Sequence, residues 1–117
     1  MKIIRFTITE QDVEQYAEIS GDFNPIHLDL NEANKQGFSN KIAHGMLTLS
    51  KTWTVLANEI LTPHDIFYQF SVSFLSPVYI GRQITLTISQ LDNDYQIEGK
   101  SDGKTIIKGI LELKEKL

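Results

Sequence analysis

One long segment with helical periodicity, from about Gly45 to Leu61, most constrains how this chain can fold. Its apolar residues recur at spacings of three and four, the pattern of a helix that buries one side. The residues expected on the buried side are Met46, Leu49, Trp53, Leu56, Ala57 and Ile60. Pro63 is expected to end the helix, because a proline ring cannot continue a helical backbone. The rest of the chain must supply a surface that covers this helix.

Strand-like alternation of apolar and polar residues flanks the helix on both sides. Before it, residues 4–8 predict a first strand. After it, strands are expected around residues 70–74 and 84–88, between two turns, and from about Thr105 to Leu113. The turns are expected at Asp92-Asn93-Asp94 and at Ser101-Asp102-Gly103, the second as a hairpin. The four later strands are expected to follow one another as a meander.

Two shorter helices are expected between the first strand and the long helix. Thr9 can cap the first of them, with Asp12 three residues later as a capping-box variant. Gly21 is expected to stop it, because the residue after a helix often needs a positive φ. The second is expected over Asn31–Gln36, ending at Gly37. This order predicts an α+β fold, in which a curved antiparallel sheet wraps around the long helix.

Composition limits the classes of function open to the chain. Its 117 residues predict a single domain, residues 1–117. A net charge of -4, without a basic run, argues against nucleic-acid binding. The absence of cysteine excludes disulfides and thiolate metal sites. The first residues alternate like a strand rather than a signal peptide, and no apolar run reaches membrane-spanning length. A cytoplasmic protein without a membrane partner is therefore expected.

The segment Gly21-Asp22-Phe23-Asn24-Pro25-Ile26-His27 places a carboxylate and an imidazole in one loop. Histidine titrates near neutrality and can take or return a proton. A carboxylate beside it can accept a hydrogen bond from the same water. Asp22 and His27 are therefore candidate catalytic residues that hold and activate one water. The alternative is an Asx-type turn at Asp22 and Asn24 with a structural His27.

A second segment, Ile42-Ala43-His44-Gly45-Met46, opens the long helix. The N-terminus of a helix offers unpaired N–H donors and a partial positive charge. Gly45 allows a substrate to approach the backbone closely, so its N–H is a candidate donor to an oxyanion. His44 is expected to be structural, positioning the start of the helix.

These segments, with Phe74-Leu75-Ser76-Pro77-Val78-Tyr79-Ile80-Gly81, resemble the MaoC-like, R-specific enoyl-CoA hydratases, a family with the hot-dog fold. The resemblance covers nearly the whole chain. Three positions depart from the family pattern. Lys41 stands where proline is frequent, Arg82 where an acidic residue is common, and Trp53 where many relatives have a small hydroxyl residue. Arg82 is either a surface charge or a cation for a phosphate of coenzyme A.

The resemblance implies a hydro-lyase that hydrates trans-2-enoyl thioesters to (R)-3-hydroxyacyl thioesters, or dehydrates them in reverse. Asp22 and His27 would hold the water, Gly45 would bind the thioester oxygen, and Asn24 would shape the loop and contact the site. The substrate would be carried by coenzyme A or by acyl carrier protein. A homodimer or an assembly of dimers is implied, with the acyl tunnel at the subunit interface. No cofactor is expected, and no metal, because no further histidine or cysteine has suitable ligand spacing.

Trp53 lies two turns beyond Gly45, roughly 12 Å along the helix. Alignment with the family places it near the catalytic loop. It is therefore expected to wall off a short tunnel for acyl groups of about four to six carbons. Its spacing alone instead favours a position in the core.

Two other classes of function stay open. In a hot-dog acyl thioesterase, the same activated water would attack the thioester carbonyl. In a non-catalytic acyl-binding or partner-binding module, no reaction would take place. The intact pair of Asp22 and His27 argues against the silent module.

Overall fold

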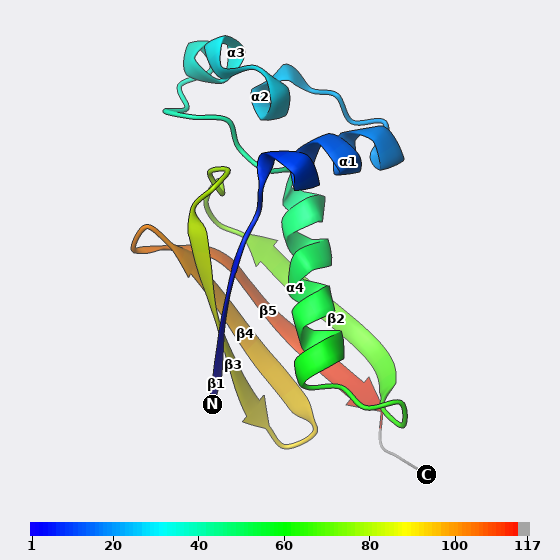
Figure 1. Ribbon diagram of the computed structural model, residues 1–117. Coiled ribbons are helices and arrows are strands. Elements are labelled where there is room, and N and C mark those ends of the chain that lie inside the picture. Colours follow the sequence, from blue (N-terminus) through cyan, green and yellow to red (C-terminus); the bar gives the residue numbers. More distant parts are fainter. Residues whose placement is uncertain (115–117) are drawn as a thin grey trace.

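The computed structural model describes residues 1–114, apart from the side chain of Phe67 (Figure 1). The elements in this part of the chain are β1 (Lys2–Thr7), α1 (Glu10–Ser20), α2 (Pro25–Leu28), α3 (Leu30–Lys35), α4 (Gly45–Glu59), β2 (Ile66–Phe74), β3 (Gln83–Leu91), β4 (Asp94–Ser101) and β5 (Lys104–Lys114). Figure 1 shows α4 lying along one face of the sheet, while α1, α2 and α3 gather at one end. This is the expected α+β hot-dog fold, a curved antiparallel sheet around one long helix.

The strands form one antiparallel sheet in the order β1-β3-β4-β5-β2. Only β3, β4 and β5 form the expected meander. The expectation that all four later strands would run consecutively is wrong, because β2 pairs with β5 at the far edge. The hairpin between β4 and β5 is confirmed, with positive φ at both Asp102 and Gly103. β1 and β2 therefore form the two edges of the sheet.

The connection between β2 and β3 explains this topology. Residues 75–82 leave the far edge of the sheet and cross to the other side beneath the helical end. The Ala43 N–H donates to the Val78 carbonyl at 2.8 Å, and the Gly81 N–H donates to the Ile8 carbonyl at 2.9 Å. These long-range bonds hold the connection in place, so that β3 begins next to β1 and pairs with it. Short-range periodicity contains no signal for such a crossover.

The capping signals in the sequence are confirmed. Thr9 Oγ1 accepts the Asp12 N–H at 3.1 Å, and the Asp12 carboxylate accepts the Thr9 N–H at 3.0 Å, which completes a capping box. Gly21 ends α1 in the left-handed region, with φ of 77°. The second short helix lies within one residue of its expected bounds. Local hydrogen bonding explains these successes, since each signal acts over a few residues.

The buried side of α4 agrees in part with the predicted one, since Leu56 is fully buried and Leu49, Trp53 and Ile60 pack against the core. Met46 and Ala57 are exposed, whereas the buried residues of the helix are Leu47, Thr48, Thr52 and Leu56. Thr48 Oγ1 donates to the His44 carbonyl at 3.3 Å, and Thr52 Oγ1 donates to the Thr48 carbonyl at 2.8 Å. Because these hydroxyls bond within the helix, their methyl groups can pack into the core at little cost. The prediction treated threonine as polar, so it left Thr48 and Thr52 out of the buried side of the helix.

Within residues 1–114, the core is formed by two clusters along α4. The first lies near the start of the helix and contains Ile8, Val13, Ala43, Leu47, Val78, Ile80, Ile84, Ile106 and Ile107. The second lies further along the helix and contains Leu56, Leu86, Ile88, Ile97 and Leu111. Each joins helix residues to strand residues that are distant in sequence. The first cluster also fixes the start of α4 against the loop that follows β2.

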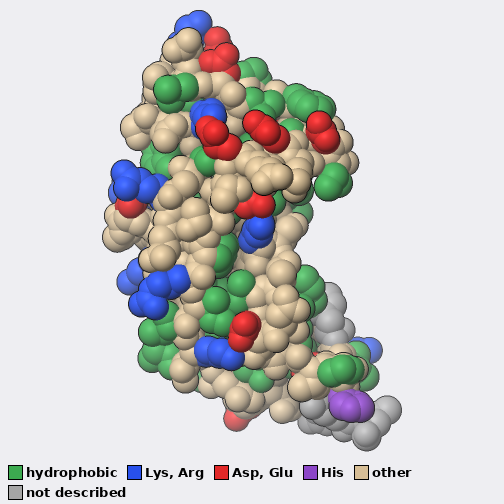
Figure 2. Space-filling model, in the orientation of Figure 1, with side chains coloured by type: hydrophobic (Ala, Val, Ile, Leu, Met, Phe, Trp, Pro, Cys, Tyr) green, Lys and Arg blue, Asp and Glu red, His purple; other side chains and the backbone are tan. Residues whose placement is uncertain are grey.

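Side chains of both charge signs are spread over the face seen in Figure 2, with acidic groups over the helical end. Lys51 and Asp12 form an ion pair at 3.0 Å between α4 and α1. Lys41 forms an ion pair with Glu10 and so connects the loop before α4 to α1. Among the described residues, no helix is both long enough and apolar enough to cross a membrane.

Candidate active site

The loop after α1 is built by two successive side-chain to backbone bonds. The Asp22 carboxylate accepts the Asn24 N–H at 3.1 Å, and Asn24 Oδ1 accepts the Ile26 N–H at 3.2 Å. Asn24 thereby caps α2, whose first residue is Pro25. This short helix was not predicted, although asparagine followed by proline is a recognised start signal. The turn and the helix together present Asp22 and His27 on one side.

His27 is buried, with 8% of its surface exposed. Its Nδ1 lies 2.7 Å from the Ile42 carbonyl oxygen. A carbonyl only accepts, so Nδ1 carries the hydrogen and Nε2 of the neutral ring keeps its lone pair. Burial lowers the pKa of His27 below its ordinary value of 6.5, opposed by the Ile42 bond and the Asp22 carboxylate. His27 is thus held as a neutral base.

Asp22 lies beside this ring but is exposed. A carboxylate oxygen of Asp22 and one ring nitrogen each from His27 and His44 all lie within 4.8 Å of one another. A water that donates one ordinary hydrogen bond to each of two acceptors, at its bent H–O–H angle, spans roughly 4.4–4.7 Å. This separation is short enough for one water to contact Asp22 and His27 at once, and the shared water stays a prediction.

His44 also lies against this pair, a contact that was not predicted from the sequence. Its ring stacks on that of His27, with centroids 3.8 Å apart and planes 28° apart. Its Nε2 donates to the Asp22 carbonyl oxygen at 3.0 Å. The position of His44 directly before the glycine of the second motif was the available signal, but only the fold brings the two motifs together.

By distance alone, Asp22, His27 and His44 could surround a cation. Their geometry fits such a ligand set poorly. One nitrogen of each ring is already engaged by a backbone carbonyl, His27 Nδ1 by that of Ile42 and His44 Nε2 by that of Asp22. His44 Nδ1 is also buried away from solvent. The arrangement is better suited to moving protons than to holding a metal.

A cavity of about 370 Å³ adjoins His27, although Asp22 is not among the residues that line it. Its lining is mostly apolar and consists of His27, Ile42, Ala43, Gly45, Thr48, Phe74, Leu75, Ser76, Pro77, Val78 and Ile106. Gly45 is the first residue of α4, where backbone N–H groups have no partner within the helix. The structure therefore brings the imidazole of the first motif and the helix start of the second to one apolar space.

The structure does not bring the remaining candidates to this cavity. Asn24 acts in the loop, as described above. Trp53 packs against the second core cluster, with its ring 5.8 Å from that of Phe70. It is not among the residues that line the cavity. Arg82 lies 3.7 Å from the Asp102 carboxylate on the exposed surface. The predicted contacts of Trp53 and Arg82 with substrate stay predictions.

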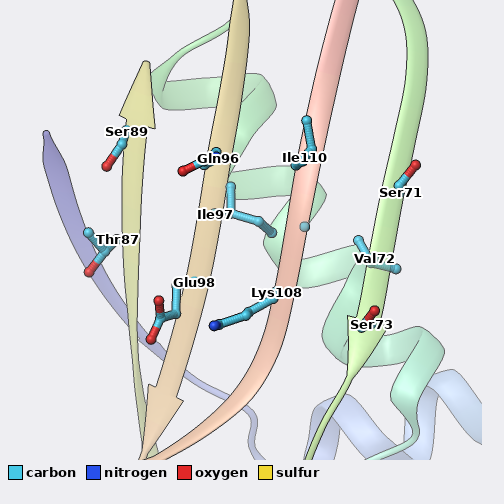
Figure 3. Close-up of a pocket in the computed structure, with 11 residues that line it drawn as sticks. Ser71, Val72, Ser73, Thr87, Ser89, Gln96, Ile97, Glu98, Lys108 and Ile110 are labelled. Carbon is cyan, nitrogen blue, oxygen red and sulfur yellow. The ribbon is translucent and has the colours of Figure 1, made fainter. Parts of the chain in front are cut away.

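A larger hollow, of about 480 Å³, lies on the face of the sheet opposite α4 (Figure 3). Its labelled side chains are half serine, threonine and glutamine, and the others are Val72, Ile97, Ile110, Glu98 and Lys108. Glu98 and Lys108 face each other across β4 and β5. None of the predicted site residues lines it. By size alone, this hollow would be the preferred candidate for the active site. Of the two spaces, however, the smaller cavity is the one that combines a buried base with a helix N-terminus.

A family model described as a MaoC-like domain matches residues 2–114. The chain therefore belongs to the MaoC-like family. The 3-hydroxyacyl-[acyl-carrier-protein] dehydratase of Arabidopsis thaliana mitochondria is 40% identical over 76 residues, which cover 65% of this chain and 45% of that protein. The (R)-specific enoyl-CoA hydratase of Rhodospirillum rubrum is 36% identical over 83 residues, covering 71% of this chain and 58% of that protein. The chain thus spans about half the length of these curated relatives.

Solved structures agree over a larger share of both chains. The unliganded R-hydratase PhaJ1 of Pseudomonas aeruginosa superposes with a TM-score of 0.83 and 28% identity, covering 99% of this chain and 81% of that one. The (R)-hydratase of Aeromonas caviae gives a TM-score of 0.81 and 26% identity, covering 94% and 89%. The whole hot-dog framework around the candidate site is therefore shared with these proteins.

Proposed function

We propose that this protein is a hydro-lyase that adds water to trans-2-enoyl thioesters, or removes it from (R)-3-hydroxyacyl thioesters. One observation carries the proposal: a neutral, buried His27 and the Asp22 carboxylate lie close enough to share one water beside an apolar cavity. Relatives named as hydratases and dehydratases of acyl thioesters support the same chemistry.

In the hydration direction, the water held by Asp22 and His27 attacks the β-carbon of the enoyl group. The new C–O bond forms as the water loses a proton to the pair, and the double-bond electrons move toward the thioester oxygen. The Gly45 N–H, at the positive end of α4, stabilises the enolate oxygen. The pair then returns a proton to the α-carbon. Because Asp22 and His27 are coupled, the proton belongs to the pair rather than to either residue.

The cavity supports an acyl substrate of modest size. Most of its lining is apolar, as the chain of an acyl group requires, and His27 and Gly45 supply the polar groups for the reacting end. Assays with both thioester forms would show whether the carrier is coenzyme A or acyl carrier protein. The names of the relatives include each of these carriers.

We further propose that the working unit is a homodimer joined along β2. This strand forms one edge of the sheet, and its residues next to the cavity continue into the cavity wall. Large apolar side chains are exposed on and directly after β2, namely Ile66, Tyr68, Phe74 and Leu75. An unpaired apolar edge favours pairing with another strand. A second copy would cover this edge and the side of the cavity that Phe74 and Leu75 border.

An assay with crotonyl-CoA tests the reaction and separates the alternatives. Loss of the enoyl chromophore without release of thiol identifies a hydratase. Release of thiol identifies a thioesterase, and neither change leaves a binding module. His64→Ala provides a matched control for His27→Ala, because His64 is exposed in the loop between α4 and β2.

A further inference from the structure

His44 connects the parts of the candidate site that come from different regions of the chain. It precedes Gly45 and is the N-cap residue of α4. Within the described residues its side chain does not cap that helix; its Nε2–H instead donates to the Asp22 carbonyl at 3.0 Å. This bond fixes the backbone of the water-binding aspartate relative to the oxyanion donor.

The ring of His44 also fixes the orientation of His27. The two rings stack at 3.8 Å, while Tyr16 of α1 lies 4.9 Å away from His44 with its ring tilted by 57°. His44 is only 2% exposed, so it has little room to turn. With Nδ1 bonded to Ile42, the His27 ring is thus held at one nitrogen and along one face. The lone pair of its Nε2 therefore points in one fixed direction.

The hydrogen bonding of His44 is confined to one of its two ring nitrogens. Its Nε2–H is used by Asp22, and its Nδ1 is buried with no hydrogen-bond partner among the described residues. The titratable groups around His44 are Tyr16 of α1, Asp22 of the loop and His27 of α2.

We propose that His44 is a positioning residue: its bond to the Asp22 backbone and its stack on His27 hold the pair where one water reaches both. The inference rests on the proposed hydration. His44 acts through Asp22 and His27, and not on the substrate itself. A small displacement of either group would separate them from the shared water, and misplacement of about 1 Å can reduce a rate about 10²-fold.

Two substitutions separate the functions of the ring and of the hydrogen bond. In His44→Phe the flat ring is kept and the donor is lost. In His44→Gln the amide nitrogen replaces Nε2 as donor, and the ring is lost. Ser101→Ala is the matched control, because Ser101 is a buried polar residue on the β4–β5 hairpin that also donates to a backbone carbonyl, that of Gln83 at 2.9 Å.

The measurements are kcat and KM for crotonyl-CoA hydration, the pH dependence of kcat/KM, and the thermal midpoint. His44→Phe is expected to reduce kcat about 10²-fold with little change in KM, and His44→Gln to recover part of that loss. In both variants the acid limb of kcat/KM should move to higher pH, because removing the second imidazole removes a group that lowers the pKa of His27. Ser101→Ala should lose stability only.

A folded His44→Phe protein with the kcat and acid limb of the parent would overturn the inference. If His44→Phe does not fold, His44→Gln decides: a parental kcat with an unmoved acid limb contradicts positioning. A parent protein without hydratase activity contradicts the proposed function instead, so the two failures are distinguishable.

Discussion

The ring of Phe74 lies beside Gly45, so closely that a Cβ atom on this glycine would be 3.7 Å from Cε1 of the ring. That distance is ordinary van der Waals contact. Alanine can therefore occupy position 45 without displacing Phe74. The same methyl group would, however, project where a substrate must approach the backbone N–H. A substitution at Gly45 can therefore impair catalysis without impairing folding.

Gly45→Ala is accordingly expected to fold and to lose activity. Alanine is a better helix former than glycine, so the thermal midpoint should stay the same or rise slightly. Because the methyl group keeps the thioester oxygen away from the N–H, hydration of crotonyl-CoA should fall by about 10²-fold, as when one oxyanion donor is lost. Parental kcat in folded Gly45→Ala would show that the thioester oxygen binds elsewhere. Calorimetry and steady-state kinetics on the same preparation provide both measurements.

Asp22 and His27 are expected to act as one unit. Positioned acid–base groups contribute about 10²–10⁴-fold each, so Asp22→Asn and His27→Ala should each nearly abolish hydration. The double variant should be hardly worse than either single one, since both act on the same water. His64→Ala should retain the parental rate. Normal turnover in folded Asp22→Asn would eliminate the shared-water mechanism.

The pH dependence of kcat/KM follows from the direction of the His27 shift. Burial lowers the pKa of His27 below 6.5, and only the neutral ring can accept a proton. Activity should therefore persist below pH 6.5 and fall as the pH falls through the lowered pKa. The Asp22 carboxylate opposes the shift, so the residual activity of Asp22→Asn should have its acid limb at still lower pH. An acid limb above pH 6.5 in the parent would contradict a buried neutral base.

His27 should also affect folding stability over the same range of pH. Its folded pKa is depressed, so the unfolded chain binds more protons once the pH falls below the unfolded value near 6.5. The contribution of neutral His27 is full above that pH and is lost as the pH falls toward the folded pKa. The unfolding free energy of the parent, relative to His27→Ala, should therefore decline on acidification. A difference that is constant between neutral and acidic pH would exclude this linkage.

The proposed dimer predicts different effects for two exposed apolar residues. Tyr68 lies on the edge strand β2 and Leu91 at the β3–β4 hairpin, with 60% and 52% of their surfaces exposed. A glutamate at either position should cost the folded chain little, because both side chains already contact solvent. Tyr68→Glu should convert the dimer to monomers and reduce activity, whereas Leu91→Glu should do neither. Light scattering provides the mass, and a fully active monomeric parent would refute the shared edge.

The sequence predicts local features of this fold better than long-range ones. The capping box at Thr9, the stop at Gly21 and the hairpin at Asp102 depend on bonds within a few residues, and all are present. The position of β2 was missed because it depends on a crossover held by bonds such as Gly81 to Ile8. The candidate site divides in the same way. Asp22 and His27 share one motif, whereas the stacking of His44 on His27 needs the tertiary fold.

The size of the acyl pocket can be tested at two aromatic residues. Phe74 lines the cavity, whereas Trp53 packs with Phe70 in the second core cluster. Phe74→Ala should enlarge the cavity and raise kcat/KM for octenoyl relative to crotonyl thioesters. If Trp53 walls the tunnel, as the family alignment predicts, Trp53→Ala should shift the same ratio. If it belongs to the core alone, truncation should cost about 3–5 kcal/mol of stability and leave the ratio unchanged.

The two variants must be compared in both measurements, because a destabilised protein can lose activity without changing its preference. The ratio of kcat/KM for the two thioesters is insensitive to the fraction of folded enzyme, while the thermal midpoint reports the packing. The observed positions favour a changed ratio in Phe74→Ala and a lowered midpoint in Trp53→Ala. A changed ratio only in Trp53→Ala would instead place the end of the acyl chain beside the second cluster, with a tunnel that extends along α4 past Thr52.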